Sequence, residues 1–316
     1  MSARWSDVCL VFAATENFLP GAVVSIGSFL KQHPRFGGDI VLCHDGLPGQ
    51  LRESLESAFP PLRFERVGAA LEQRLIRLGE ARPAMRSKLP DFYSLEAFRM
   101  EGFRKVFYCD CDLLFRGPVD ELFDSAESLL CCGDTEFMRG WCHDADTYRP
   151  IESPSRAGPG GALERTFSCG VLLIDGRLTG ERAYSELAEL VTTESWHGAD
   201  TVHSDQFLLN RRFAGQQTLV SSTYNYRTHL VDAIRAREGI RAEEAKVLHF
   251  TGAVKPWMPG RMMWQLMGDG RFSPSRFFGL WYEAWLECLA SGHLRAVARV
   301  AGRGAGGAAP QPGEAE

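Results

Sequence analysis

The 316-residue sequence has no apolar run as long as the roughly 20 residues that a membrane-spanning helix needs. It has no basic excess either, because 35 Lys and Arg stand against 40 Asp and Glu, and this disfavours nucleic acid as a partner. Its nine cysteines include no C-x-x-C pair of the kind that marks zinc and redox sites. Most of them lie in apolar runs, so we expect packed, free thiols in a reducing cytoplasm.

The first hundred residues alternate between strand-like and helix-like patterns. Apolar or alternating runs at 7–14, 39–45 and 62–67 predict strands, and apolar residues at helical spacing in 20–33 and 47–59 predict helices. Single helices between strands imply right-handed crossovers and a largely parallel sheet. The fold class is therefore α/β, and ligands in such folds bind beyond the carboxyl ends of the strands.

Two aspartates, Asp110 and Asp112, follow a further strand-like run at 105–109. In an extended segment, residues i and i+2 point the same way, so the two carboxylates can converge on one cation. Oxygen ligands favour Mn²⁺ or Mg²⁺, ions that commonly join a protein to a diphosphate. The alternative is a pair of turn or helix-cap aspartates.

A second D-x-D, Asp144 and Asp146, has no apolar strand before it. It opens the segment 148–164, which is rich in Pro, Gly and Ser, and we expect this pair to lie in a solvated, mobile loop. In the same region Trp141 and Tyr148 are either sugar-packing aromatics or anchors of the loop. His143 shares these two alternatives.

The segment KVLHFTGAVKPW, residues 246–257, combines three groups suited to a metal and a phosphate. His249 offers an imidazole nitrogen, Gly252 allows the backbone to approach a ligand closely, and Lys255 supplies a compact positive charge. A core histidine beside a surface lysine is the alternative. Three such groups in seven residues favour a diphosphate site shared with Asp110 and Asp112.

Several segments follow one another in a fixed order along residues 7–257: FAATENFLPGAVVSIGSFLKQH, RSKLPDFYSLEAFRMEGFRKVFYCDCDLLF, FSCGVLLID, SDQFLLN and HFTGAVKPW. Together they resemble retaining glycosyltransferase family 8, which includes glycogenin, bacterial lipopolysaccharide galactosyl- and glucosyltransferases and galactinol synthases. The resemblance implies a GT-A type, Rossmann-like sheet that is mixed, mostly parallel and flanked by helices. We expect this catalytic domain to cover residues 1–270.

The resemblance also implies the ligands of the site. Asp110, Asp112 and His249 would hold Mn²⁺, with Mg²⁺ as the alternative, and the diphosphate of the donor would complete the coordination shell. The residues expected around the nucleotide sugar are Thr15, Asn17, Phe18, Lys88, Cys111, Ser168, Cys169, Gly170, Gly252 and Lys255.

The catalytic residues implied by the resemblance are Asp205, Gln206 and Lys255. Asp205 is the motif carboxylate that could act as a nucleophile in a two-step retaining route. In the family, however, the glutamine is often nearest to the anomeric carbon, and an amide is a poor nucleophile. We therefore favour transfer on one face of the sugar, with Lys255 and the metal stabilising the leaving diphosphate.

The resemblance implies transfer of a hexose, glucose or galactose, from a nucleotide diphosphate sugar. We expect a UDP-linked donor and a glycan, a lipid-linked saccharide or a small polyol as acceptor. Thr15 replaces an Asp common in bacterial members, and Ser168 replaces an Asn that contacts donor sugars, so base and hexose stay open. The alternatives are a catalytically weak nucleotide-sugar-binding member, a self-glycosylating glycogenin-like protein, or a two-metal phosphotransferase.

The C-terminal part of the sequence predicts an extension over residues 271–300. Ser273 as N-cap and Pro274 as first helical residue open a helix over 273–290. Beyond it, the sequence offers at most a weak contact with the inner face of a membrane, through three arginines on one helical face: Arg295, Arg299 and Arg303. We expect residues 301–316 to form a disordered tail.

Overall fold

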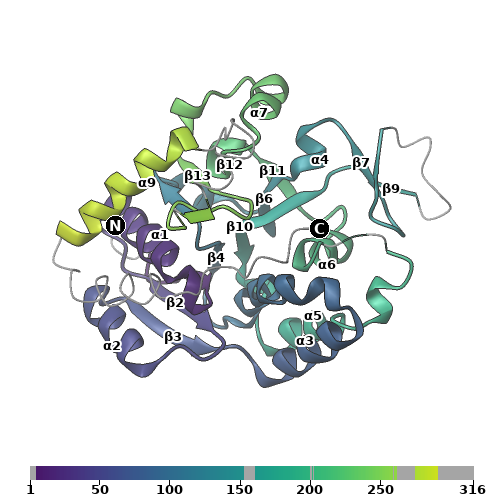
Figure 1. Ribbon diagram of the computed structural model, residues 1–316, viewed down its shortest axis with the longest axis horizontal. Helices are drawn as coiled ribbons and strands as arrows, with labels where there is room; N and C mark the ends of the chain where they lie inside the picture. Colours follow the sequence, from purple (N-terminus) through teal and green to yellow (C-terminus); the bar gives the residue numbers. More distant parts are fainter. Residues whose placement is uncertain are drawn as a thin grey trace.

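The computed structural model describes residues 5–152, 161–199, 201, 203–258, 260–261 and 275–290. Within them, seven strands form the central sheet (Figure 1). In spatial order these are β11 (Thr218–Val220), β6 (Leu129–Gly133), β10 (Phe167–Asp175), β4 (Lys105–Cys109), β1 (Val8–Ala13), β2 (Asp39–His44) and β3 (Leu62–Arg66). Neighbouring strands are parallel except around β10, which is antiparallel to both β4 and β6. The prediction of a mixed, mostly parallel α/β sheet is confirmed.

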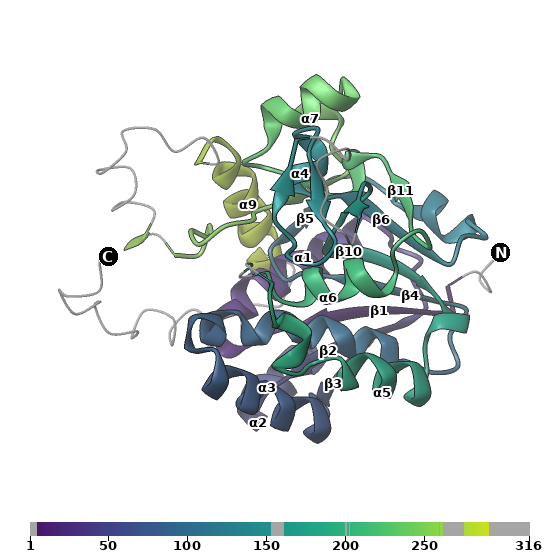
Figure 2. The ribbon, with the colours of Figure 1, turned by 90° about the vertical axis from the view of Figure 1, so that its right-hand side faces the viewer.

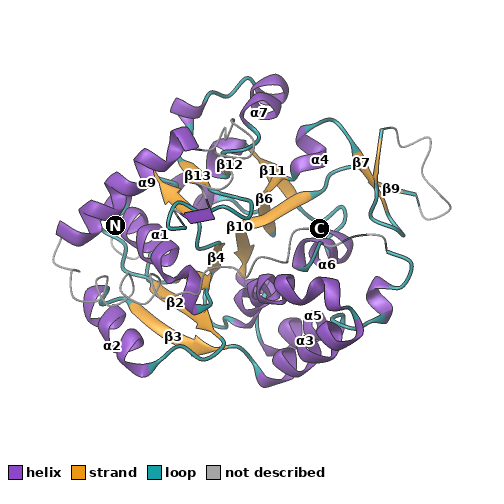
Figure 3. Cartoon of the chain, in the orientation of Figure 1, coloured by secondary structure: helices purple, strands orange, loops and turns teal. Residues whose placement is uncertain are grey.

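Helices cover both faces of this sheet because its strands are apolar on both sides (Figure 3). Leu10 and Phe12 of β1 pack with α1 and α2, whereas Cys9 and Val11, which point the opposite way, pack with the helices of the other face. The first pair of helices is α1 (Leu19–Gln32) and α2 (Gly49–Ala58), close to the predicted bounds. The other face is covered by α3 (Ala69–Ala81), the 3₁₀ segment η3 (Pro83–Arg99), α5 (Glu181–Glu189) and α6 (Asp205–Arg212).

A second, smaller sheet brings the C-terminal motif to the carboxyl end of β4. It contains β12 (Tyr226–Arg227), β13 (Val247–His249) and β5 (Leu113–Phe115), in that order. β13 runs antiparallel to β5, with His249 in register with Leu113, so the histidine lies beside Asp112. This pairing joins two motifs that are far apart in the sequence.

The predicted C-terminal helix is present as α9 (Ser275–Cys288) and lies against α1 (Figures 1 and 2). The contact is close, because a Cβ added at Gly27 of α1 would lie 2.5 Å from the Cys288 sulfur. Trp281 is fully buried in this packing. The predictions for Ser273, Pro274, the three arginines and the tail of residues 301–316 concern positions outside the described residues.

The prediction of a solvated loop around the second D-x-D is wrong for Asp144. This residue ends β7 (Cys142–Asp144), the middle strand of a small sheet with β8 (Pro150–Ile151) and β9 (Ala162–Leu163). It is buried, and its Oδ1 accepts hydrogen bonds from the backbone amides of Asp146 and Thr147. It is therefore a turn aspartate, and Asp146 is the exposed member of the pair.

The aromatic residues of this region are also mostly internal. Tyr148 and His143 are each 1% exposed and stack on one another, with ring centroids 4.3 Å apart. They anchor the segment, and Trp141 remains exposed. Among the described helices, none combines the length and the hydropathy required to cross a bilayer.

Candidate metal and nucleotide-sugar site

The structure brings Asp110, Asp112 and His249 together where β4 ends and β5 begins. His249 Nε2 lies 3.0 Å from Asp112 Oδ1 and 3.5 Å from Asp110 Oδ2. One ligand atom from each residue lies within 4.8 Å of the other two. The described part of the chain contains no second cluster of this kind.

The pKa values of the two aspartates are shifted in opposite directions. Burial and the neighbouring Asp112 raise the pKa of Asp110 to about 6, while the Tyr108 hydroxyl donates to its Oδ1 at 2.9 Å. Burial alone would raise the pKa of Asp112 too, but Lys255 and then His249 outweigh it and hold that pKa below its usual range. The Lys255 ammonium contacts Asp112 directly and also donates to the Phe250 carbonyl at 3.0 Å.

Two carboxylates and one imidazole form a donor set that suits Mn²⁺ or Mg²⁺. The backbone leaves room for the donor set, because the residue of β10 that faces the cluster is a glycine, Gly170. A Cβ at this position would lie 2.3 Å from His249 Cε1 and 2.9 Å from Asp110 Oδ2. The residues present therefore fit a divalent cation.

The predicted nucleoside segment packs against the K-P-W turn. Phe18, half-buried, meets Trp257 edge to face at 5.7 Å between centroids, and Lys255 Nζ lies 5.7 Å from the Phe18 ring centroid. The Trp257 indole donates to the Asn17 carbonyl at 3.0 Å. Thr15 is half-buried at the start of this segment. The Phe18 ring and the Lys255 ammonium are thus neighbours.

Other predicted residues take varied positions around the cluster. Gly252 has φ of +99°, a conformation that favours glycine, in the turn before Lys255. Cys111 is a packed thiol whose sulfur donates to the Ala13 carbonyl. Lys88 is exposed on η3, where it forms an ion pair of 3.8 Å with Asp91.

Asp205, at the start of α6, is buried like Asp112 and His249. Its Oδ2 accepts from the Ser94 hydroxyl at 2.7 Å and its Oδ1 from the Ser204 hydroxyl at 3.2 Å. Burial, and then the nearby carboxylate of Asp91, raise its pKa to about 7. Gln206 is half-buried, and its amide donates to Asp134 at 3.4 Å.

Two further predicted residues, Ser168 and Cys169 of β10, are also buried. Ser168 is in contact with Asn225, a residue that the sequence did not indicate. The Asn225 amide lies between Ser168 and His249. A single asparagine in the stretch STYNYR matches no motif, and its role appears only once the two strands β12 and β13 are paired.

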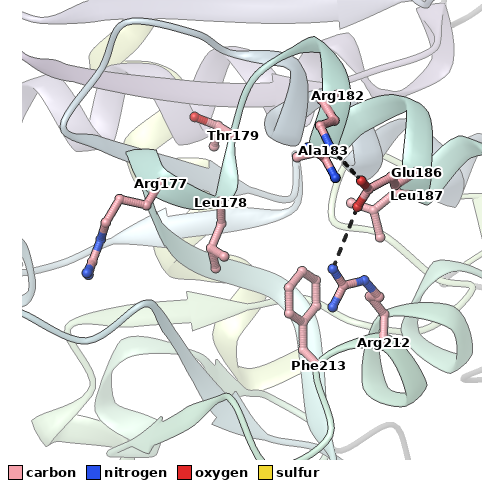
Figure 4. Close-up of a pocket in the computed structure, with 9 residues that line it drawn as sticks. All are labelled: Arg177, Leu178, Thr179, Arg182, Ala183, Glu186, Leu187, Arg212 and Phe213. Carbon is pink, nitrogen blue, oxygen red and sulfur yellow. Dashed lines mark hydrogen bonds and ion pairs between the residues drawn. The ribbon is translucent and has the colours of Figure 1, made fainter.

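A cavity of about 360 Å³ elsewhere on the protein is not part of this site (Figure 4). It adjoins the residues that follow Asp175, where Glu186 pairs with Arg182 at 2.9 Å and with Arg212 at 4.0 Å. Asp175 is in register with the first residue of β4, whereas Asp110 follows the last. The length of the strand therefore separates this cavity from the metal cluster.

The fold is that of the GT-A glycosyltransferases. A solved structure of the galactosyltransferase LgtC, in complex with donor and acceptor sugar analogues, matches with a TM-score of 0.59 at 18% identity. The match covers 96% of this chain and 98% of that one. The glycosyltransferase GlyE of Streptococcus pneumoniae TIGR4 matches with a TM-score of 0.55 at 20% identity, covering 92% of this chain and 64% of GlyE.

The chain belongs to glycosyltransferase family 8, whose family profile matches residues 9–259. Glycogenin of Neurospora crassa is 23% identical over 284 residues, which are 89% of this chain and 35% of that protein. Glycogenin-1 of Mus musculus is 22% identical over 258 residues, 80% of this chain and 66% of the mouse protein. The chain thus spans about a third of the first relative and just under two thirds of the second.

Proposed function

We propose that this protein transfers a hexose, glucose or galactose, from a UDP-linked donor to a carbohydrate acceptor with retention of configuration. The observation that carries this proposal is the convergence of Asp110, Asp112, His249 and Lys255 at the carboxyl end of β4. A carboxylate pair, an imidazole and an ammonium are the groups that a metal-bound diphosphate requires. Family membership supports the same reading.

In this proposal Asp110, Asp112 and His249 hold Mn²⁺ or Mg²⁺, which when bound neutralises charge on the leaving diphosphate. Lys255 exchanges its contact with Asp112 for a phosphate oxygen, within reach because its ammonium already lies in the cluster. Gly252 gives the preceding turn its left-handed conformation. Phe18, which lies beside Lys255, would stack on the base.

Retention is proposed to occur on one face of the sugar and not through a glycosyl-enzyme on Asp205. Both oxygens of that carboxylate accept hydrogen bonds from serine hydroxyls, and the side chain is buried. A carboxylate held in this way is poorly placed to attack an anomeric carbon. The departing phosphate would take the acceptor proton instead, and Asp205 and Gln206 would hold the sugar.

The acceptor is proposed to be a separate molecule, a glycan, a lipid-linked saccharide or a polyol. Self-glycosylation on tyrosine would require an accessible hydroxyl. Among the seven tyrosines, Tyr282 is the most exposed, at 37%, and its hydroxyl donates to the Pro256 carbonyl at 2.6 Å. We therefore expect no mass increase of the intact protein after incubation with UDP-glucose or UDP-galactose and Mn²⁺.

The direct test is hydrolysis of UDP-glucose and UDP-galactose without acceptor, with Mn²⁺ or with EDTA. We expect slow, Mn²⁺-dependent release of UDP from one donor, lost in Asp112→Asn. Asp146→Asn is the matched control, because it changes an exposed aspartate of the second D-x-D. Binding of UDP with no turnover of any sugar nucleotide, alone or with acceptors, would support a binding protein instead.

A further inference from the structure

Asn225 is a buried residue that contacts the metal cluster through His249. It is 0% exposed, and its amide makes two contacts with residues of the site. Its Oδ1 lies 2.7 Å from His249 Nδ1, and its Nδ2 donates to the Ser168 hydroxyl oxygen at 3.3 Å. Because the amide is fully buried, losing either partner would leave a polar atom without a hydrogen bond, which destabilises the folded protein.

The amide determines which nitrogen of His249 carries a proton. A carbonyl oxygen can only accept, so Nδ1 of the imidazole donates to Asn225. Nε2 is then directed at Asp110 and Asp112, at 3.5 and 3.0 Å. In metal sites, a ligating histidine usually donates its other N–H in this way, and losing that acceptor costs about 10- to 100-fold in metal affinity.

The backbone fixes Asn225 and His249 relative to one another. Asn225 immediately precedes β12, and β12 pairs in parallel with β13, with Arg227 in register with His249. The amide of Thr228 donates to the His249 carbonyl at 3.0 Å. Asn225 and His249 are therefore attached to two paired strands, and the side-chain bond between them needs little ordering.

We infer that Asn225 is a positioning residue, which holds His249 in its metal-ligating tautomer and links the metal cluster to Ser168 on β10. The inference rests on the proposed function, because it assumes that Asp110, Asp112 and His249 bind a divalent cation. It adds that one asparagine connects that cation to the strand proposed to contact the donor sugar.

The test is a titration of Mn²⁺, followed by electron paramagnetic resonance, on the full chain without nucleotide. Asn225→Ala removes the acceptor, and we expect the Mn²⁺ affinity to fall about 10- to 100-fold. Asn225→Asp keeps an oxygen that can only accept, and we expect its affinity to stay within about threefold of the wild type.

If Asn225 had only a structural role, the Mn²⁺ affinity would not depend on whether residue 225 keeps an oxygen that accepts from His249. Wild-type affinity in Asn225→Ala, or an equal loss in the Ala and Asp variants, would overturn the inference. If the Ala chain does not fold, Asn225→Ser, whose hydroxyl is too short to span the same distance, takes its place with the same expectation. If the wild type itself binds no Mn²⁺, the proposed metal site is wrong. If the wild type binds Mn²⁺ and every variant binds it equally well, only the role of Asn225 is wrong.

Discussion

At the scale of single residues, the site is governed by the groups around Asp112. This carboxylate is buried, and both Lys255 and His249 contact it. A buried carboxylate without partners would be costly, so the ammonium stabilises the ionised form when no cation is bound. Lys255 consequently has two competing partners, Asp112 and the proposed diphosphate.

Replacing Lys255 with Met should separate these two roles. We expect Lys255→Met to bind UDP in the presence of Mn²⁺ at least about tenfold more weakly, because one charge-assisted contact is lost. Its affinity for Mn²⁺ alone should not fall, since the ammonium no longer competes for Asp112. Isothermal titration calorimetry measures both, with Lys31→Met, an exposed lysine paired with Glu287, as control. Unchanged UDP affinity would contradict the assignment.

Asp205 should make stability depend on pH. Its ordinary pKa is 3.8, and burial and Asp91 raise the folded value to about 7. Because the unfolded chain releases this proton at lower pH, the wild type loses stability as pH rises from about 4 to 7, by at most about 4 kcal/mol. The neutral variant Asp205→Asn lacks this loss, so its Tm relative to the wild type should rise over that interval. A Tm difference that stays constant from pH 4 to 8 would contradict the raised pKa.

Sequence motifs revealed the residues whose chemistry is distinctive, and missed those whose role depends on a contact. Asp110, Asp112 and His249 were predicted together because each belongs to a recognisable segment. Asn225 was not, since nothing in its neighbours indicates that it faces His249. Asp144 was wrongly assigned to a solvated loop because its partners are backbone amides, which the sequence does not display.

At the scale of elements, β10 must pass close behind the metal cluster. Gly170 makes this approach possible, and a methyl group there would collide with His249 and Asp110. We expect Gly170→Ala to lower Mn²⁺ affinity at least about tenfold and to cost about 1–3 kcal/mol of stability through overpacking. Gly49→Ala is the control, because its Cβ would meet nothing closer than 3.9 Å. Normal Mn²⁺ binding in Gly170→Ala would show that the cluster does not need this approach.

Helix α9 connects to the nucleotide segment through aromatic rings. Trp281 packs on Trp257, with centroids 5.6 Å apart, and Trp257 in turn contacts Phe18. We expect Trp281→Ala to destabilise the protein by about 3–5 kcal/mol, seen as a lower Tm, and to weaken UDP binding. Leu286→Ala, on the same helix but 61% exposed, should change neither. Wild-type UDP affinity in Trp281→Ala would show that α9 does not contribute to nucleotide binding.

Elements with several periodic residues were predictable, and short ones were not. The strands β1, β2, β3 and β4 are five or six residues long and gave clear apolar patterns. β7, β8 and β9 have only two or three residues each, too few for any period to appear. Their sheet depends on tertiary contacts such as the packing of Tyr148 on Phe207 of α6.

At the scale of the whole molecule, the sheet gathers motifs from distant parts of the chain at one edge. β1 and β4 are parallel neighbours, so the segment after β1 and the aspartates after β4 emerge together. β10 returns antiparallel between β4 and β6 and adds Gly170, and the second sheet adds His249. This arrangement follows the rule that ligands bind beyond the carboxyl ends of parallel strands.

The central claim is that the site at the carboxyl end of β4, formed by Asp110, Asp112 and His249, binds a nucleoside diphosphate through a divalent cation. Thermal denaturation of the wild type with UDP, GDP, CDP or ADP, each with and without Mn²⁺, tests it most directly. A ligand at a hundred times its Kd adds about 2.7 kcal/mol, a rise in Tm of about 4 °C for a chain of this size. We predict such a rise for UDP only when Mn²⁺ is present. No rise with any nucleotide, with or without metal, would contradict the account.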